Sequence, residues 1–183
     1  MNSAAPLVDV VVPLEAGLLE RARAGDVRAF ERLYREHVGR VHGLCLRMLR
    51  DAAAAEDCTQ QAFIRAWSSL ARFEMRSGFA TWLHRIAVNV VLDHRRRRST
   101  VAAVDDEGRD EGWTVDTPME IDDIEAAIRS LPEGARDVLV LCGLYGHTHA
   151  DAGAMLGLAE GTCKAQLHRA RQLLRIRLNL EES

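Results

Sequence analysis

The sequence has no long apolar run and few aromatic residues. No stretch approaches the roughly 20 apolar residues that a membrane-spanning helix needs, and aromatic residues make up 5% of the 183 positions. The apolar patch at residues 10–12 lies between Asp9 and Pro13 and has no basic start, so it does not match a signal peptide. We therefore expect a cytoplasmic protein without direct membrane insertion.

The sequence also lacks paired cysteines and catalytic motifs. Its four cysteines, Cys45, Cys58, Cys142 and Cys163, are widely spaced and fall on or beside apolar helical stripes, which predicts buried, reduced thiols. Without ligand-pair spacing they do not indicate a zinc site, and we expect neither a metal nor a cofactor. No carboxylate pair, Ser/His/Asp arrangement or Gly-rich phosphate loop indicates an enzyme, so we do not expect one.

Alternating apolar and polar residues, the pattern of a half-buried strand, are absent, and so are internal repeats. Apolar residues instead recur with helical spacing over residues 14–24, 27–49, 52–70, 81–97, 120–130, 133–145, 148–156 and from 161 onward. The net charge is −3, but residues 99–125 hold ten acids and a single Arg109, which leaves 23 Lys/Arg against 17 Asp/Glu elsewhere. The electrostatic field around each part of the surface, rather than the net charge of the chain, decides whether a polyanion can bind there.

We predict an all-α protein with two small helical domains joined by a flexible acidic linker. Residues 99–119 have the composition of a solvated linker because they lack apolar periodicity and are rich in Asp, Glu, Gly and Thr. The expected order is a flexible N-terminus at 1–13, a helical domain at 14–98, the linker at 99–119, and a second helical domain at 120–180.

The last helix is the most informative part of the chain. Its apolar residues form a core-facing stripe at helical period: Cys163, Leu167, Ala170, Leu174 and Leu178. Basic and amide side chains lie on the other side, where Arg can bind guanine, Gln can bind adenine and Lys can neutralise phosphate. A short helix at 148–156 and a Gly157-containing turn precede it, which is the helix-turn-helix arrangement.

A second candidate nucleic-acid surface lies on the helix at 81–97. A row at i, i+4, i+7 and i+11 contains Arg85, Asn89, Leu92 and Arg96, and the run continues to four consecutive arginines at 95–98. The segment 73–79 just before it brings aromatic rings next to a basic side chain, a combination that can hold unstacked bases. Phe79 and Trp82 could instead fill the core of a small helical domain.

These motifs resemble those of extracytoplasmic-function (ECF) sigma factors, in the sigma-70 family. The pattern that resembles conserved region 2 is Asp57-x-x-Gln60-x-x-Phe63-x-x-Ala66-Trp67, then Phe73, then Phe79-x-Thr81-Trp82-Leu83-x-Arg85-Ile86-Ala87-x-Asn89. The pattern that resembles region 4 is Leu131-Pro132-x-x-x-Arg136 and Gly161-Thr162-x-Lys164-x-x-Leu167-His168-Arg169-Ala170-Arg171. The resemblance spans about residues 14–178.

The resemblance implies a promoter-recognition subunit of RNA polymerase. The residues that would dock on the β′ clamp helices are Asp57, Gln60, Gln61 and Phe63. Those that would capture and melt the −10 element are Phe73, Arg76, Phe79, Trp82, Arg85, Asn89 and Arg96. Those that would read or anchor the −35 element are Thr162, Lys164, Ala165, Gln166, His168, Arg169 and Arg171. The implied partners are core RNA polymerase, through its β′ and β subunits, promoter DNA and an anti-sigma factor.

Several positions depart from the family pattern. Gln61 stands where Glu is usual, which removes one carboxylate from the docking patch. The segment 74–76 replaces a frequent Arg-Gly-Asp, so the −10 base preference cannot be inherited. In the first helix of the pair, Ala152 stands where the family usually has a core Ile, and Gly153 places a helix-weakening residue in the helix interior. Ala159 stands where a Ser or Pro normally starts the next helix. We therefore expect region 4 to fold with a smaller margin of stability.

Two other functional classes are compatible with parts of the sequence. A conventional helix-turn-helix regulator acting outside the polymerase would explain the last helix but not the Arg/Asn row at 85–96. Copurification with core polymerase would distinguish a polymerase subunit from such a regulator. A small helical enzyme using His and Cys has no motif to support it.

Overall fold

The computed structural model describes residues 13–102 and 121–178, and these residues contain helices but no strand. The chain divides into two compact units, Met1–Val91 and Leu92–Ser183. This agrees with the expected all-α fold. Along the described ranges, no helix combines the length and the hydropathy that crossing a membrane requires.

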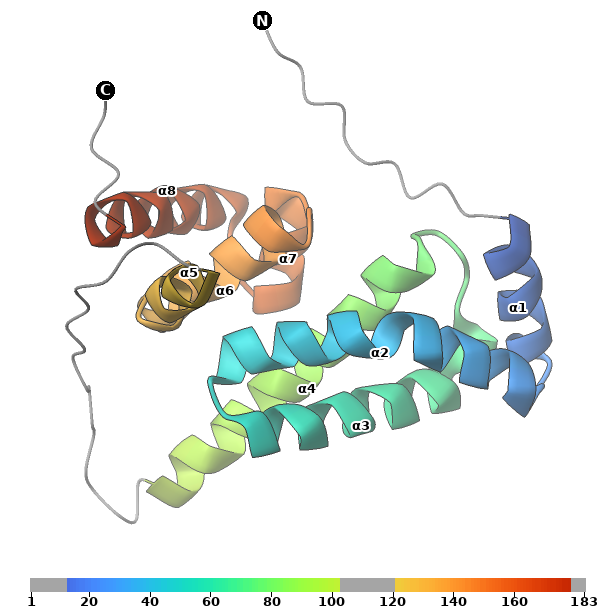
Figure 1. Cartoon of the computed structure of the whole chain (residues 1–183). Helices are drawn as coiled ribbons and strands as arrows, with labels where there is room; N and C mark the ends of the chain where they lie inside the picture. Colours follow the sequence, from blue (N-terminus) through green and yellow to red (C-terminus); the bar gives the residue numbers. More distant parts are fainter. Residues whose placement is uncertain (1–12, 103–120, 179–183) are drawn as a thin grey trace, which may run out of the picture. The chain divides into compact units, whose positions relative to one another are not determined.

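The first unit is built from α1 (Pro13–Arg23), α2 (Val27–Leu49), α3 (Ala52–Ser69), the short 3-10 helix η1 (Leu70–Arg72) and the first part of α4 (Phe79–Ala102). Figure 1 shows α2 and α3 running antiparallel side by side, with α1 at the start of α2. The helix α2 has the bounds that the sequence predicts.

Local sequence fixes both ends of α2. The Asp26 carboxylate accepts hydrogen bonds from the backbone N–H groups of Arg28 (2.9 Å) and Ala29 (3.1 Å), as an N-cap residue should. At the other end, Arg50 adopts a left-handed conformation and donates its backbone N–H to the Leu46 carbonyl at 2.8 Å.

Small residues let α2 and α3 pack closely. The fully buried large side chains of α2 include Leu33, Val41, Leu44 and Met48. The buried face of α3 consists mainly of small residues, including Ala55, Ala62 and Ala66. Because alanine carries only a methyl group, the larger side chains of α2 can fill the space between the two helices. The core of the first unit therefore forms between these helices and the buried face of α4.

The helix α4 is longer than the sequence analysis predicted. It begins two residues earlier, at Phe79, and continues to Ala102, so residues 99–102 are helical instead of linker. No Gly or Pro interrupts this stretch, and the Thr100 hydroxyl donates to the Arg96 carbonyl at 2.9 Å within the helix. The rest of the expected linker, like the N-terminal residues 1–12, lies outside the described residues.

The second unit contains the last part of α4, α5 (Ile121–Arg129), α6 (Glu133–Val138), the π-helical η2 (Leu139–Leu144), α7 (His149–Leu156) and α8 (Glu160–Arg177). The single α-helix expected over 133–145 is thus wrong in its second half, where the hydrogen bonds widen and Tyr145 N–H reaches the Val140 carbonyl at 3.1 Å. Residues 135–141 are all buried. A helix buried on all sides is central to its domain, and α8 packs across it.

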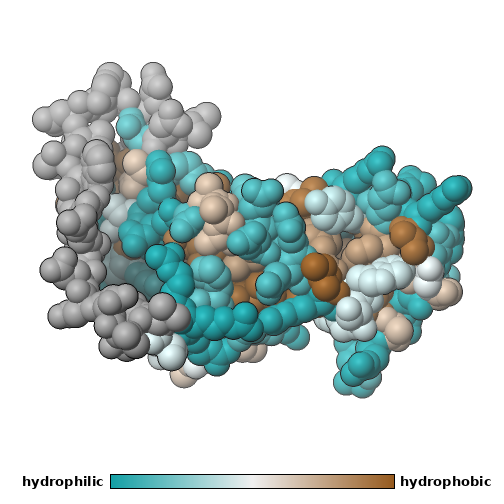
Figure 2. All heavy atoms as spheres, turned by 90° about the horizontal axis from the view of Figure 1, so that it is seen from below, coloured by the Kyte–Doolittle hydropathy of each residue, from teal (hydrophilic) through white to brown (hydrophobic). Residues whose placement is uncertain are grey.

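Hydrophobic side chains are largely inside these units. On the face drawn in Figure 2, hydrophilic residues predominate and hydrophobic ones show as separate patches. Scattered exposed apolar residues are normal on a globular surface, so only those that coincide with a candidate site need an explanation.

Candidate nucleic-acid interfaces

The pair α7 and α8 forms the helix-turn-helix that the sequence predicts. Thr148 caps α7 by accepting the Asp151 backbone N–H at 3.0 Å. Gly157 ends α7 in the left-handed conformation (φ 69°), and Leu158 N–H then reaches the Gly153 carbonyl at 2.9 Å. This turn delivers the chain directly into α8.

Gly153 has a different role from the one the sequence suggested. It is buried, and a Cβ placed there would lie only 2.6 Å from the Leu158 carbonyl oxygen and 3.5 Å from the Cys163 sulfur. The glycine therefore permits the close approach of α7 to the turn and to α8. The expectation that Gly153 merely weakens α7 is corrected, because a larger residue would not fit.

The helix α8 has the two faces that the sequence predicts. Cys163, Leu167 and Ala170 are buried against the rest of the unit, and Leu174 and Leu178 are half-buried at the end of the same stripe. The exposed side chains on the opposite side include most of the predicted −35 set: Thr162, Lys164, Ala165, His168, Arg169 and Arg171. A helix exposed on one side in this way can enter a major groove.

Gln166 differs from its neighbours because it is half-buried. Its amide nitrogen lies 3.6 Å from the position that a Cβ on Gly134 would take, so its side chain rests against the start of α6. Arg169, by contrast, is exposed one turn further along α8. Both Gln166 and Arg169 carry side chains that can bind base edges, and Arg169 is the more accessible of the two.

Lys164 forms an ion pair within α8. Its ammonium lies 2.7 Å from the Glu160 carboxylate, and this contact lowers the pKa of Glu160. Both side chains are exposed, so the pair contributes little to stability. A DNA phosphate would compete with Glu160 for the Lys164 charge, which is consistent with phosphate anchoring rather than base reading.

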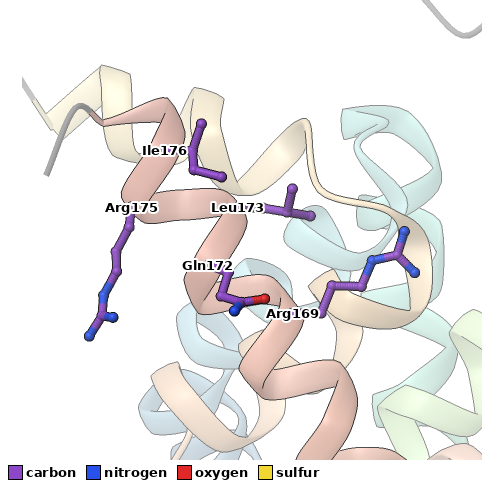
Figure 3. Close-up of a pocket in the computed structure, with 5 residues that line it drawn as sticks. All are labelled: Arg169, Gln172, Leu173, Arg175 and Ile176. Carbon is purple, nitrogen blue, oxygen red and sulfur yellow. The ribbon is translucent and has the colours of Figure 1, made fainter. Parts of the chain in front are cut away.

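Figure 3 shows the far end of α8, where Arg169, Gln172, Leu173, Arg175 and Ile176 line a pocket. Arg175 projects to one side of the helix, whereas Leu173 and Ile176 project to the other. All five residues come from one helix, so they do not enclose a ligand as a small-molecule site would. The basic groups at 169 and 175 extend the cationic surface of α8.

The polar row on α4 is exposed as predicted. Arg85, Asn89 and Arg96 are exposed, Leu92 is half-buried, and Arg96 forms an ion pair with Asp93 one turn before it. The opposite face of α4 is apolar and buried: Leu83, Ala87, Val88, Val90 and Val91. The row is therefore accessible to DNA along one side of the helix.

The aromatic residues beside this row pack on one another. Ring centroids are 4.8 Å apart for Phe73 and Trp82, 5.7 Å for Phe79 and Trp82, and 6.1 Å for Phe73 and Phe79. Phe73 and Phe79 are buried, and only Trp82 is half-exposed. The two phenylalanine rings therefore have the alternative role, as core residues. They can affect DNA binding only indirectly, by fixing the shape of the loop between them.

That loop, residues 74–78, is short and charged. Glu74 and Arg76 form an exposed ion pair of 2.8 Å, and Met75 between them has a positive φ of 55°. The sequence pattern indicates Arg76, but not Met75, as a residue that contacts DNA. No sequence signal could have identified Met75, because methionine has no preference for the left-handed conformation.

On α3, the predicted docking residues do not all share one face. Asp57, Gln60 and Gln61 are exposed, but Phe63 is 4% exposed and contacts Tyr34, with ring centroids 4.7 Å apart. The step of six residues from Asp57 to Phe63 corresponds to a rotation of about 600° around the helix axis, so the two side chains point in different directions. The sequence placed Phe63 among the docking residues, but its side chain lies in the core and cannot share an exposed face with Asp57.

Two residues that the sequence did not assign to the docking surface continue the exposed face of α3. Ile64 is 65% exposed and Trp67 is 37% exposed. Together with Asp57 and Gln60 they follow 3-4-3 spacing, which could have identified them from the sequence. The accessible face of α3 is thus acidic and amide-rich at one end and apolar at the other.

The arginine run at 95–98 is not uniformly available to a ligand. Within the second unit, which starts at Leu92, the Arg95 guanidinium makes two hydrogen bonds to the Asp137 carboxylate, at 2.5 and 3.0 Å. Burial raises the pKa of Asp137, and the Arg95 charge opposes that rise. Arg95 is therefore engaged with protein, whereas Arg96, Arg97 and Arg98 are exposed.

The cysteines are free thiols, and Cys45, Cys58 and Cys163 are buried as predicted. Cys142 was also predicted to be buried but is only half-buried. Burial raises the pKa of Cys45 to about 12, so its sulfur is an unreactive thiol near neutral pH. Among the residues that the structure describes, no three His, Cys, Asp or Glu side chains are grouped to hold a metal ion.

Comparison with known proteins finds family matches for both helical units. The sigma-70 region 2 family matches residues 33–101, and the sigma-70 region 4 family matches residues 121–174. The chain is 36% identical over 173 residues to the RNA polymerase sigma-H factor of Pseudomonas aeruginosa, covering 86% of this chain and 90% of that protein. It is 31% identical over 176 residues to the ECF RNA polymerase sigma factor SigW of Bacillus subtilis, covering 87% and 94%.

A solved structure shows the same architecture. The sigma factor RpoE of Bartonella quintana, crystallised with the anti-sigma factor NepR, superposes with a TM-score of 0.71 at 25% sequence identity, covering 85% of this chain and 100% of that one. The similarity therefore extends over both helical units.

Proposed function

Because the chain belongs to the sigma-70 family, within its extracytoplasmic-function group, it directs promoter-specific transcription initiation, and we propose how its surfaces divide that work. Residues 14–98 bind core polymerase and the −10 element, residues 120–180 bind the −35 element, and the residues between α4 and α5 join them. The protein acts in the cytoplasm through binding, with no catalytic step of its own.

The observation that carries the −35 assignment is the two-faced helix α8. Its buried stripe fixes the helix on the unit. Its exposed side presents Arg169, while Lys164 and Arg171, seven residues apart, lie together on another exposed side next to the buried stripe. Arginine pairs with guanine in the major groove, while lysine and flanking arginines hold phosphates. We assign Arg169 to base reading and Lys164 and Arg171 to anchoring.

For the −10 element, the support comes from the exposed row on α4. Asn89 lies between Arg85 and Arg96 on one accessible side of the helix, and the half-exposed Trp82 lies two turns earlier on the same side. Amide and guanidinium groups can bind bases once the duplex has opened, and an aromatic ring can stack on them. Asn89 and Trp82 would act on separated strands, and the arginines would hold the backbone.

For docking on the β′ clamp helices, the support is the exposed face of α3. It carries Asp57, Gln60 and Gln61, which can form charge-assisted and amide hydrogen bonds with a basic partner. Phe63 supports this face from the core, through its contacts with Phe30 and Tyr34. The β subunit would be contacted through the second unit.

An anti-sigma factor is the fourth partner that we propose. The support is the likeness to RpoE of Bartonella quintana, which was crystallised with the anti-sigma factor NepR. A regulator of this kind would act by covering the polymerase-binding or DNA-binding surfaces, since binding to a surface excludes its other ligands.

Run-off transcription tests the proposed function. Core polymerase with and without this protein is supplied with a pool of DNA fragments carrying a randomised upstream region, and the transcribed templates are sequenced. We expect transcripts that depend on the protein and share two short sequence elements. If no template is enriched although the protein is folded, promoter recognition by this chain is refuted. Copurification with core polymerase separates this function from a regulator outside the polymerase.

A further inference from the structure

Two apolar residues near the end of α8 have no role in the surfaces assigned so far. Ile176 is 72% exposed, and Leu173, three residues before it, is half-buried. Figure 3 shows both side chains on the same side of α8 as Arg169, as their spacing requires. The −35 assignment uses the Arg169 guanidinium but gives no role to these two apolar side chains. This side of α8 therefore presents a cation beside an apolar surface.

The positive charge of α8 is not balanced within the part of the chain that the structure describes. Residues 160–177 contain five Lys and Arg side chains and one carboxylate, that of Glu160, which pairs with Lys164 at 2.7 Å. Arg169 and Arg171 are exposed, and neither forms an ion pair with another described residue. A cluster of like charges attracts an anionic partner. An anion that also carries an apolar group would match the side of α8 that Figure 3 shows.

The chain itself contains a segment of this composition. Residues 103–120, which join α4 to α5, hold seven Asp and Glu against a single basic residue. Their one aromatic residue is Trp113, and three of the acids lie within three residues of it: Asp110, Glu111 and Asp116. Aromatic residues are scarce in segments that stay solvated, because a large apolar side chain gains free energy from burial. The segment therefore carries carboxylates and one large apolar group close together.

The segment is long enough to reach this side of α8. It continues directly into α5, which packs against α8 within the second unit (Figure 1). An extended chain covers about 3.3 Å per residue, so the eight residues from Trp113 to the start of α5 can span up to about 26 Å. The 18 residues of α8 are about 27 Å long. A segment tethered in this way also acts at a high effective concentration.

We propose that residues 105–116 bind α8 in the free protein, with Trp113 against Leu173 and Ile176 and the neighbouring carboxylates against Arg169. Bound there, the segment covers Arg169 and competes with promoter DNA for the same helix. DNA then binds only those molecules in which the segment has left α8. The inference rests on the proposed function, because it adds regulation by the chain itself to the −35 surface.

Two alanine variants test the apolar contact without changing any charge, Trp113→Ala and Ile176→Ala. Each full-length variant, free of polymerase, is titrated with a duplex carrying the −35 element that the wild-type holoenzyme selects. If the segment covers α8 in about nine molecules of ten, loss of the contact lowers the Kd about tenfold. We expect this gain from each variant and no further gain from the double variant, since both remove one contact. Val27→Ala, at an exposed apolar position of α2, should leave the Kd unchanged.

Two triple variants separate contact by the acids from a general effect of net charge. The first neutralises the acids around Trp113: Asp110→Asn, Glu111→Gln and Asp116→Asn. The control neutralises three exposed acids of α1 and α2 and changes the net charge equally: Glu20→Gln, Glu31→Gln and Glu36→Gln. We expect the Kd for the duplex to fall about tenfold for the first and to stay within about twofold for the control, because salt screens distant exposed charges.

The indole N–H signal of Trp113 reports the contact directly and needs no DNA. It is identified by nuclear magnetic resonance in the full chain, isotope-labelled on tryptophan, by its loss from Trp113→Ala. We expect the signal to move in Ile176→Ala, and to move in the same direction when the −35 duplex is added to wild type. Both changes release the indole from α8.

An indole signal that Ile176→Ala leaves unchanged would overturn the inference. Wild-type duplex affinity in Trp113→Ala would overturn it as well, and so would equal gains for the two triple variants, since net charge alone would then account for them. The indole signal does not depend on promoter recognition. The inference can therefore be judged separately from a failure of the proposed function, in which wild type selects no promoter.

Discussion

At the scale of single residues, two positions of the second unit combine structure and function most directly. Gly153 lets the two helices of the DNA-binding motif approach, and Arg169 stands on the exposed side of the second one. Substitution of Gly153 should change the stability of the second unit, whereas substitution of Arg169 should change the selectivity between promoter sequences.

We expect Gly153→Ala to destabilise the second unit by about 1–3 kcal/mol, because the new methyl group would overlap a backbone carbonyl that cannot move freely. The control is Gly161→Ala, at an exposed helical position where a Cβ would meet nothing within 4 Å, and it should stabilise by about 0.5–1 kcal/mol. Urea unfolding followed by circular dichroism measures both. If Gly153→Ala matched the control, the close approach would have no energetic importance.

On α8, Arg169→Ala should relax selectivity at one −35 position by about 1–3 kcal/mol, because a base contact discriminates between sequences. Lys164→Ala and Arg171→Ala should instead weaken all promoters equally and lower the salt slope by about one unit each, because phosphate contacts carry no sequence information. Binding to a panel of −35 variants at two salt concentrations distinguishes the two classes. An unchanged ranking and salt slope in all three variants would contradict −35 recognition by this face.

At the scale of elements, the start of α8 and the exposed face of α3 each have a feature that a single substitution can test. The N-cap position of α8 is Ala159, which has extended backbone angles but no side chain to accept a hydrogen bond. The exposed face of α3 combines polar residues near its start with Ile64 and Trp67 near its end. Each feature leads to one prediction.

Ala159→Ser should stabilise the second unit by about 0.5–2 kcal/mol, because a serine hydroxyl at the N-cap can accept a backbone N–H of the first turn that otherwise lacks a partner in the helix. Chemical denaturation of the full chain, with the first unit as an internal reference, measures the change. Ala159→Val provides the comparison, since it cannot accept a hydrogen bond. Equal stability of the serine and valine variants would show that water already satisfies this end of α8.

Asp57→Arg should weaken binding to core polymerase and leave the fold intact, because Asp57 is exposed on the face that we assign to the clamp helices. Glu20→Arg makes the same charge reversal at an exposed position of α1 and serves as control. Competition with labelled wild type for core polymerase gives the relative affinities. Wild-type affinity of Asp57→Arg would exclude this residue from the docking surface.

At the scale of the whole molecule, initiation requires both units to act on one promoter, first as duplex and then as separated strands. In the proposed division of work, binding to the closed duplex would use α8, whereas the row on α4 would act after opening. The two stages can be measured separately, which allows a defect to be assigned to one unit.

Asn89→Ala should reduce open-complex formation more than closed-complex binding, because its amide would contact bases only after the strands separate. Permanganate reactivity of thymines in the −10 element reports opening, and duplex binding at low temperature reports the closed complex. Glu36→Ala, at an exposed position on α2, is the control. Unchanged thymine reactivity in Asn89→Ala would leave Asn89 with only a structural role.

The sequence by itself determined the all-α fold, the bounds of α2, the helix-turn-helix and the two faces of α8, because each follows from helical periodicity and local capping. Family motifs in the sequence also identified the two promoter elements as targets.

Only the tertiary structure decided that Phe63 belongs to the core, that Gly153 is required by a close approach, and that Met75 has a left-handed backbone. These features depend on contacts between residues on different helices or across a turn, or on a loop whose ends are held by packing. Periodicity shows which residues of a helix share a face, but only packing shows what that face meets.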